Sequence, residues 1–171
     1  MDERTRYTLR PILPADEPFL WEILYHALFV EEGQAPLPRG IVRDPQIARY
    51  VRGWGREGDR GFVAVDALFQ QPVGAVWCRV LRGGEKGFAY LGDETPELTI
   101  ALLPAYRGKG IGTALLKRLF EETKGKYQAL SLSVSPNNPA KRLYERLGFR
   151  VVAMQGTHPV MAVRLGEHQH G

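Results

Sequence analysis

The stretch "LLPAYRGKGIGTALL", residues 102–116, decides the fold of this chain. It joins a strand-like run to the best helical pattern in the sequence, and it places three glycines and two cations between them. The first amides of a helix have no intrahelical partner, and that end carries partial positive charge. Glycines there let a ligand approach without meeting a Cβ. The stretch therefore predicts an anion site, most naturally for a phosphate or pyrophosphate.

Two familiar phosphate motifs do not fit these residues. A Walker A loop needs Ser or Thr after Lys109, where Gly110 stands, and a first glycine where Leu103 stands. The dinucleotide fingerprint needs a third glycine, and the two possible registers put Thr113 or Leu115 there. A tight strand-to-helix turn without a ligand is the alternative interpretation of the glycines by themselves.

Composition narrows the classes of protein that remain. The length of 171 residues suits one domain, which we place at 1–166, with a frayed tail at 167–171. The charge of +4 suits an anionic ligand, but the scattered cations do not indicate a nucleic-acid partner. We expect no membrane association and no signal peptide, and a single cysteine fits a cytoplasmic protein. The histidines and Cys78 show no metal-ligand spacing, so no metal site is predicted.

Hydrophobic periodicity predicts an α/β protein of the order β-α-α-β-β-β-α-β-α-β-β. Strands alternate with helices, yet several strands are joined as hairpins, which predicts a mixed sheet with helices on both faces. The first helix is expected to open at Ala15 or Asp16 and to reach Val30, and Asp44 is expected to cap the second. The Gly-rich connection 82–96 is long enough to be a functional or mobile loop.

A second motif follows the glycine stretch at a distance of some thirty residues. It reads "NNPAKRLYERLGF", residues 137–149. Together the two motifs resemble those of the GNAT-type N-acetyltransferases, [Gln/Arg]-x-x-Gly-x-[Gly/Ala] and Asn-x-x-Ala-x-x-Leu-Tyr-x-x-x-Gly-Phe. The resemblance is close over residues 97–149, and residues 13–58 match it only in the type of their elements.

The resemblance implies a GNAT-like fold in which the fourth and fifth strands splay apart and acetyl-CoA, as co-substrate, enters the gap. Its pantetheine arm would pair with the fourth strand, its pyrophosphate would lie on the glycine stretch, and a side chain of the second motif would contact the pantetheine. The cofactor-binding residues so implied are Ile100, Ala101, Leu102, Arg107, Gly108, Lys109, Gly110, Ile111, Gly112, Thr113, Asn137 and Tyr144.

Two residues are catalytic candidates. In the family frame Tyr144 is the phenol that protonates the departing thiolate, while by pattern alone it is a core aromatic on a helix stripe. An alkylamine has a pKa of about 10.4, so a base must remove a proton before it attacks. Glu97 is that candidate, because many family members carry a carboxylate near this point of the strand. The alternative for Glu97 is a solvated residue at a strand end.

The resemblance implies an N-acetyltransferase that moves the acetyl group directly to a primary amine, without metal. A non-catalytic acetyl-CoA sensor and a transferase of longer acyl groups are the competing hypotheses. We expect the acceptor site in residues 26–58 and 82–96, with Asp93 and Glu94 as a candidate acidic mouth, but their sequence does not identify the acceptor. The resemblance also allows a homodimer, although no sequence feature decides it.

Overall fold

The computed structural model describes residues 6–166, and the expected tail 167–171 lies outside them. A seven-stranded sheet of order β1-β2-β3-β4-β5-β7-β6 forms the centre, and only β4 and β5 pair in parallel. The order of helices and strands confirms the predicted one. The strands are β1 (Tyr7–Pro11), β2 (Arg60–Asp66), β3 (Gln71–Arg79), β4 (Glu97–Leu102), β5 (Ala129–Ser133), β6 (Arg150–Gln155) and β7 (His158–Arg164). The helices are α1 (Glu17–Ala27), α2 (Pro45–Ala48), α3 (Ile111–Thr123) and α4 (Ala140–Arg146).

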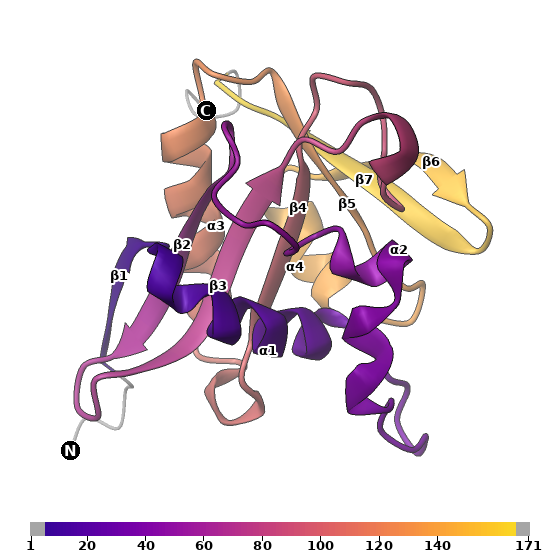
Figure 1. The fold of residues 1–171 in the computed structure, drawn as a ribbon. Helices are drawn as coiled ribbons and strands as arrows, with labels where there is room; N and C mark the ends of the chain where they lie inside the picture. The colour runs from indigo at the N-terminus through magenta and orange to yellow at the C-terminus, as the bar shows by residue number, and fades with distance from the viewer. Residues whose placement is uncertain (1–5, 167–171) are drawn as a thin grey trace.

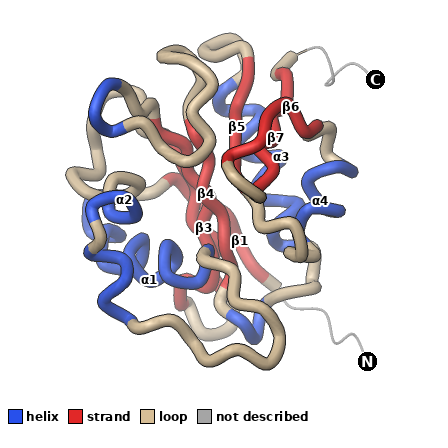
Figure 2. Tube along the Cα trace, turned by 90° about the vertical axis from the view of Figure 1, so that its right-hand side faces the viewer, coloured by secondary structure: helices blue, strands red, loops and turns tan. Residues whose placement is uncertain are grey.

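Helices cover both faces of the sheet, as predicted (Figure 1). Helix α1 packs on β3 and β4 from one side, and α3 packs on β2, β3 and β4 from the other. Figure 2 shows α1 and α2 on one side of the strands and α3 and α4 on the other. Because side chains alternate across a strand, β4 feeds two cores: Leu98 and Leu102 join the α3 side, and Ala101 joins the α1 side.

Local signals in the sequence explain where two helices begin and why one expectation is wrong. The side chain of Asp44 accepts from the amide of Gln46 and Pro45 opens α2, as predicted. Helix α1 begins at Glu17 rather than at Ala15 or Asp16, because Pro14–Asp16 form a 3₁₀ turn before it. It ends at Ala27, so Val30 lies in the following loop and not on the helix.

Strands β4 and β5 diverge soon after they meet. Their only paired position is Glu97 with Ser131, and the amide of Ser131 donates to the Pro96 carbonyl at 3.0 Å. By contrast β3 stays paired with all six residues of β4. The edge of β4 that faces β5 therefore has free backbone groups, as the splayed arrangement requires.

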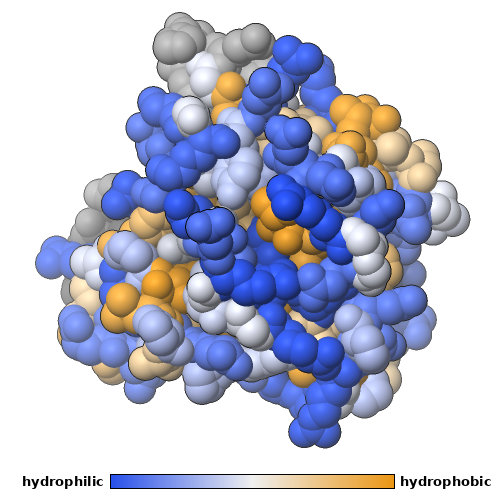
Figure 3. Space-filling view, turned by 45° about the horizontal axis from the view of Figure 1, so that its top comes forward, coloured by the Kyte–Doolittle hydropathy of each residue, from blue (hydrophilic) through white to orange (hydrophobic). Residues whose placement is uncertain are grey.

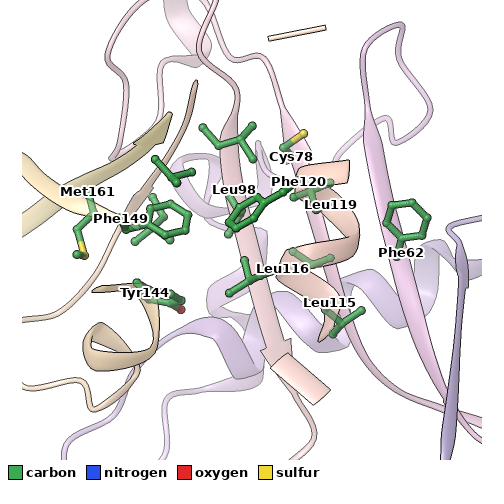
Figure 4. Packing of buried hydrophobic residues seen from close by; sticks show 14 of the residues in the cluster. Phe62, Cys78, Leu98, Leu115, Leu116, Leu119, Phe120, Tyr144, Phe149 and Met161 are labelled. Atoms are coloured by element: carbon green, nitrogen blue, oxygen red, sulfur yellow. The ribbon is translucent and has the colours of Figure 1, made fainter. Parts of the chain in front are cut away.

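The larger core lies between the sheet and helices α3 and α4, and Figure 4 shows part of it. Cys78 is fully buried there, and burial raises the pKa of its thiol to about 12. The thiol is therefore protonated and inert at neutral pH, which agrees with the prediction of a small buried hydrophobic residue.

Strand β6 is a free edge of the sheet. Its apolar side chains Val151, Val152 and Met154 are 46–58% exposed. In the upper right of Figure 3 a group of hydrophobic residues, drawn in orange, lies on the surface, on the side of the molecule where β6 lies. Within residues 6–166 there is no helix with the length and apolar character needed to cross a bilayer.

Candidate active site

A cavity of about 600 Å³ opens where β4 and β5 part, and it reaches both faces of the sheet. Its α1-side wall comes from α1, the loop after it and the segment around α2. Its other wall comes from β5, the start of α4 and the turn between β6 and β7. Of the predicted site residues, Glu97, Ile100 and Tyr144 line it together. The splay of the sheet thus brings the three into one space.

The three β4 residues predicted to bind the pantetheine arm, Ile100, Ala101 and Leu102, do not all turn their backbone groups to the same side. The amide of Leu103 donates to the Val73 carbonyl at 2.8 Å, which fixes the alternation along the strand. In this register Ala101 turns its backbone groups toward β3, and Ile100 and Leu102 turn theirs toward the gap. An added strand could therefore pair with Ile100 and Leu102, whereas Ala101 is not positioned to bond with it.

The glycine stretch forms an open anion cradle. Gly108 and Gly110 take positive φ values of 73° and 85°, and a Cβ on either would meet nothing within 4 Å. The first helical bond of α3 runs from the amide of Ala114 to the carbonyl of Gly110. The amides of residues 108–113 accordingly have no acceptor in the described part of the chain.

Side chains add charge around this cradle. Arg107 and Lys109 are both exposed beside it, and the Arg107 guanidinium also donates to the Leu102 carbonyl at 3.4 Å. Thr113, in the first turn of α3, is half-buried. Free amides and two cations at one helix end are the chemistry that binds phosphoryl groups.

Asn137 lies differently from the arrangement that the resemblance implies. Its side chain donates to Glu31 at 2.6 Å, so it ties the loop after α1 to the loop after β5. The neighbouring Asn138 lines the cavity instead, and its side chain caps α4 by accepting from the Ala140 amide at 2.9 Å. Contact between Asn137 and a ligand requires this exposed link to open.

Tyr144 belongs to the core and also lines the cavity. Its ring packs edge-on against Phe149, with 5.7 Å between centroids, and Figure 4 shows it at the lower edge of the cluster. The residue also lines the cavity, and burial raises its pKa to about 12. No group in residues 6–166 hydrogen-bonds with its hydroxyl. The phenol is therefore protonated at neutral pH and free to donate.

Glu97 is not a solvated strand end, because its side chain is 1% exposed. One carboxylate oxygen accepts from the Tyr50 hydroxyl at 2.9 Å and from the Ala89 amide at 3.0 Å. The other accepts from the Gly87 amide at 2.9 Å. Desolvation is the largest influence and raises the pKa of the carboxyl, while these hydrogen bonds oppose it. A carboxylate with a raised pKa is a stronger base than an exposed one.

The same hydrogen bonds hold the loop 82–96 over the cavity. The amide of Phe88 donates to the Tyr50 hydroxyl at 2.8 Å, so one phenol joins the loop to Glu97. A Cβ on Gly87 would overlap the Glu97 carboxylate and the Tyr50 hydroxyl, which explains the glycine. The sequence did not single out Tyr50, because its apolar spacing with Ile47 and Val51 is typical of a core position.

Asp93 and Glu94 do not form the expected acidic mouth. Neither lines the cavity, and Asp93 accepts from the Tyr90 hydroxyl at 2.7 Å. The part of the chain that the structure covers also contains no group of three His, Cys, Asp or Glu residues able to hold a metal ion.

Replacing Tyr50 with Phe tests the electrostatic role of this phenol. The Tyr50 hydrogen bond lowers the pKa of Glu97, so its loss raises that pKa further. We expect the acid limb of the pH profile of kcat/KM to move to higher pH. The Phe88 amide also loses its acceptor, which costs about 1–3 kcal/mol of stability. An unchanged acid limb in the Y50F profile would show that Glu97 does not control it.

Comparison with known proteins identifies the family. The sequence model of the Acetyltransferase (GNAT) family matches residues 17–149. The chain belongs to the GNAT family. Solved GNAT-fold structures agree along nearly the whole chain. That of yncA from Salmonella typhimurium with its cofactor acetyl-CoA superposes with a TM-score of 0.67 at 24% identity, over 95% of both chains. Phosphinothricin acetyltransferase from Sinorhizobium meliloti, in complex with acetyl-CoA, gives 0.63 at 22% identity, over 94% of this chain and 89% of that one.

Curated relatives resemble this GNAT chain over shorter stretches. The [ribosomal protein bS18]-alanine N-acetyltransferase of Haemophilus influenzae is 44% identical over 61 residues, 35% of this chain. The L-methionine sulfoximine/L-methionine sulfone acetyltransferase of Salmonella typhimurium is 37% identical over 82 residues, 47% of this chain. The matches span 42% and 44% of those relatives, less than half of each. The solved structures and the divergence of β4 from β5 confirm the splayed α/β fold that the sequence predicted.

Proposed function

We propose that this GNAT protein is an N-acetyltransferase that moves the acetyl group of acetyl-CoA to a primary amine. The observation that carries the proposal is that three open features follow one another along this part of the molecule. Free amides at 108–113 lead to the open edge of β4, and that edge leads to a cavity lined by Tyr144 and Glu97. A strand-to-helix turn that binds no ligand would not need free amides, an open strand edge and a cavity together.

The residues present fit acetyl-CoA. The cradle at 108–113 suits its pyrophosphate, and the outward backbone groups of Ile100, with the amide of Leu102, suit the amides of its pantetheine arm. When bound, the coenzyme supplies an activated acetyl group as a thioester. We assign the cradle and β4 to binding and orientation, which make the reaction effectively unimolecular.

Within the cavity the two candidate groups have complementary protonation states. Glu97 accepts a proton, directly or through water, from an amine that arrives as an ammonium. Tyr144 carries its proton at neutral pH and donates a hydrogen bond where the leaving sulfur would develop charge. Both groups are largely buried, and the low local dielectric strengthens both interactions.

Calorimetry with acetyl-CoA and a matched pair of glycine variants test the binding part. Gly110 and Gly125 have φ values of 85° and 86° and open space around them, but only Gly110 lies in the cradle. Alanine at either position costs about 1–2 kcal/mol of stability. We expect G110A to weaken acetyl-CoA binding about 10- to 150-fold, through misplaced amides, and G125A to bind as wild type. Equal affinities in the two variants would contradict the cradle.

Release of free thiol with a panel of amines tests the transfer part. Binding of acetyl-CoA with no amine-dependent thiol release would favour the sensor hypothesis over the enzyme. Tyr144, with its unpartnered hydroxyl facing the cavity, favours the enzyme, because a sensor has no use for a free donor at that depth.

A further inference from the structure

We propose that the acceptor is a small primary monoamine whose body is uncharged and apolar, such as an alkyl- or aralkylamine. The inference rests on the proposed transferase function and names the substrate class of the same site. It comes from the part of the cavity that lies on the α1 side of the sheet.

The α1-side wall is mostly apolar, with the hydroxyl groups of Tyr50 and Thr99 as polar groups on it. Helix α1 contributes Leu24 and Ala27, and the segment that follows it contributes Leu28, Phe29, Leu37 and Ile41. Across from them the loop 82–96 contributes Phe88. Such a wall stabilises a hydrocarbon body by removing it from water and gives a polar body few groups to bond with.

No lysine or arginine of the described chain lines the cavity. Two arginines lie behind the lining without joining it. Arg39 donates to Glu22 at 2.6 Å, and Arg49 lies over the Phe88 ring, 4.7 Å from its centroid, and donates to the Lys86 carbonyl. The only cationic candidate in the lining is His158, which stands on the opposite wall, exposed, beside Ser135. An acceptor with a carboxylate would therefore bury that charge without a partner on the α1 side.

The carboxylates that line the cavity can pair with one ammonium group only. Glu97 is the one carboxylate in the lining. A carboxylate has about four acceptor sites, and Glu97 uses two on one oxygen and one on the other. One site remains for the amine or for a bridging water. Glu22 pairs with Arg39, and Glu31 keeps its charge but is exposed and does not line the cavity, so a polyamine would find no second carboxylate within the lining.

The test compares four amines by kcat/KM in a thiol-release assay at saturating acetyl-CoA: phenethylamine, phenylalanine, phenylalaninamide and spermidine. Phenylalanine differs from phenethylamine by its carboxylate, and phenylalaninamide keeps the bulk without the charge. We expect phenethylamine to exceed phenylalanine and spermidine on the order of 100-fold or more. Phenylalaninamide should lie nearer to phenethylamine than to phenylalanine.

A charge added to the wall gives an independent readout. Ile41 is half-buried, so lysine can reach the cavity from it, and I41M is the uncharged control of similar length. We expect I41K to narrow the preference for phenethylamine over phenylalanine at least 10-fold, because the ammonium pairs with the carboxylate. The I41M variant should keep the wild-type ratio.

The outcomes separate this inference from the function on which it rests. A preference for phenylalanine or spermidine, or a phenylalaninamide rate as low as that of phenylalanine, overturns the inference and leaves the transferase intact. A peptide with an apolar N-terminal residue that exceeds phenethylamine 10-fold also overturns it, in favour of a protein acceptor. Acetyl-CoA binding without turnover of any amine overturns both.

Discussion

Replacing Glu97 with Gln is expected to lower kcat/KM about 10²- to 10⁴-fold, the usual contribution of a general base. Glutamine keeps the shape of the side chain but cannot take the proton of the incoming ammonium. The affinity for acetyl-CoA should stay within a small factor, because the cradle at 108–113 lies apart from Glu97. Steady-state kinetics and calorimetry on the same preparation measure the two effects.

The E97Q variant should also change stability in a pH-dependent way. Its amide nitrogen faces the Gly87 amide, donor against donor, which costs about 1–3 kcal/mol. Because the folded pKa of Glu97 is raised, its own contribution is greatest below the unfolded pKa and is lost as pH rises through the folded pKa. The stability deficit of E97Q should therefore be largest in acid and shrink as pH rises.

The D66N variant is a matched control for E97Q. The Asp66 carboxylate, at the β2–β3 turn, also accepts from two amides and one tyrosine hydroxyl, those of Leu68, Phe69 and Tyr106. It does not line the cavity. D66N should lose stability and keep kcat at saturating acetyl-CoA. Similar losses of kcat in both variants would show that the effect of E97Q comes from general loss of stability and not from a missing base.

Tyr144→Phe should lower kcat about 10- to 150-fold, a smaller effect than that of E97Q. A pKa of about 12 in the free protein makes this phenol a weaker acid than an exposed tyrosine, which disfavours complete transfer of its proton to sulfur. We infer that the phenol stabilises the sulfur by a hydrogen bond, worth about 1.5–3 kcal/mol to a charged group. The proton that the amine nitrogen loses when it becomes an amide can then protonate the thiolate to give the thiol product.

Stability distinguishes this role from a structural one. The Tyr144 hydroxyl bonds with no described residue, so its removal should leave the free energy of unfolding unchanged or slightly higher. Tyr127→Phe, outside the cavity, is the control and should keep full activity. A wild-type rate in Y144F would return Tyr144 to the status of a core aromatic, and a loss above about 10³-fold would indicate full proton transfer.

The order of helices and strands was predictable because local signals mark its boundaries. Pro45 after Asp44 and the glycines around α3 act within a few residues of their own position. The start of α1 was not predictable to the residue, since Pro14 and Pro18 both suit a first turn and the chain uses the first for a 3₁₀ turn. Boundaries of this kind depend on tertiary packing.

The site was predictable only where it follows a motif. The open glycine turn and Tyr144 lie on the elements that the two motifs predicted, and their proposed roles stay predictions. The environment of Glu97 was not predictable from the sequence. Tyr50 is 47 residues away in sequence, and the loop amides that bond with Glu97 carry no side-chain signature. Contacts across such distances are set by the fold as a whole. For the same reason the sequence did not predict that apolar residues of 28–41 line the cavity.

Burial of Cys78 has a practical consequence for every assay above. The chain has one sulfhydryl, and in the native state it is sealed from solvent and held in its unreactive form. A colorimetric disulfide reagent added during turnover should count coenzyme product alone, with no background from the enzyme. Added in denaturant, it should titrate one equivalent per molecule, so one dye can report both catalysis and global unfolding.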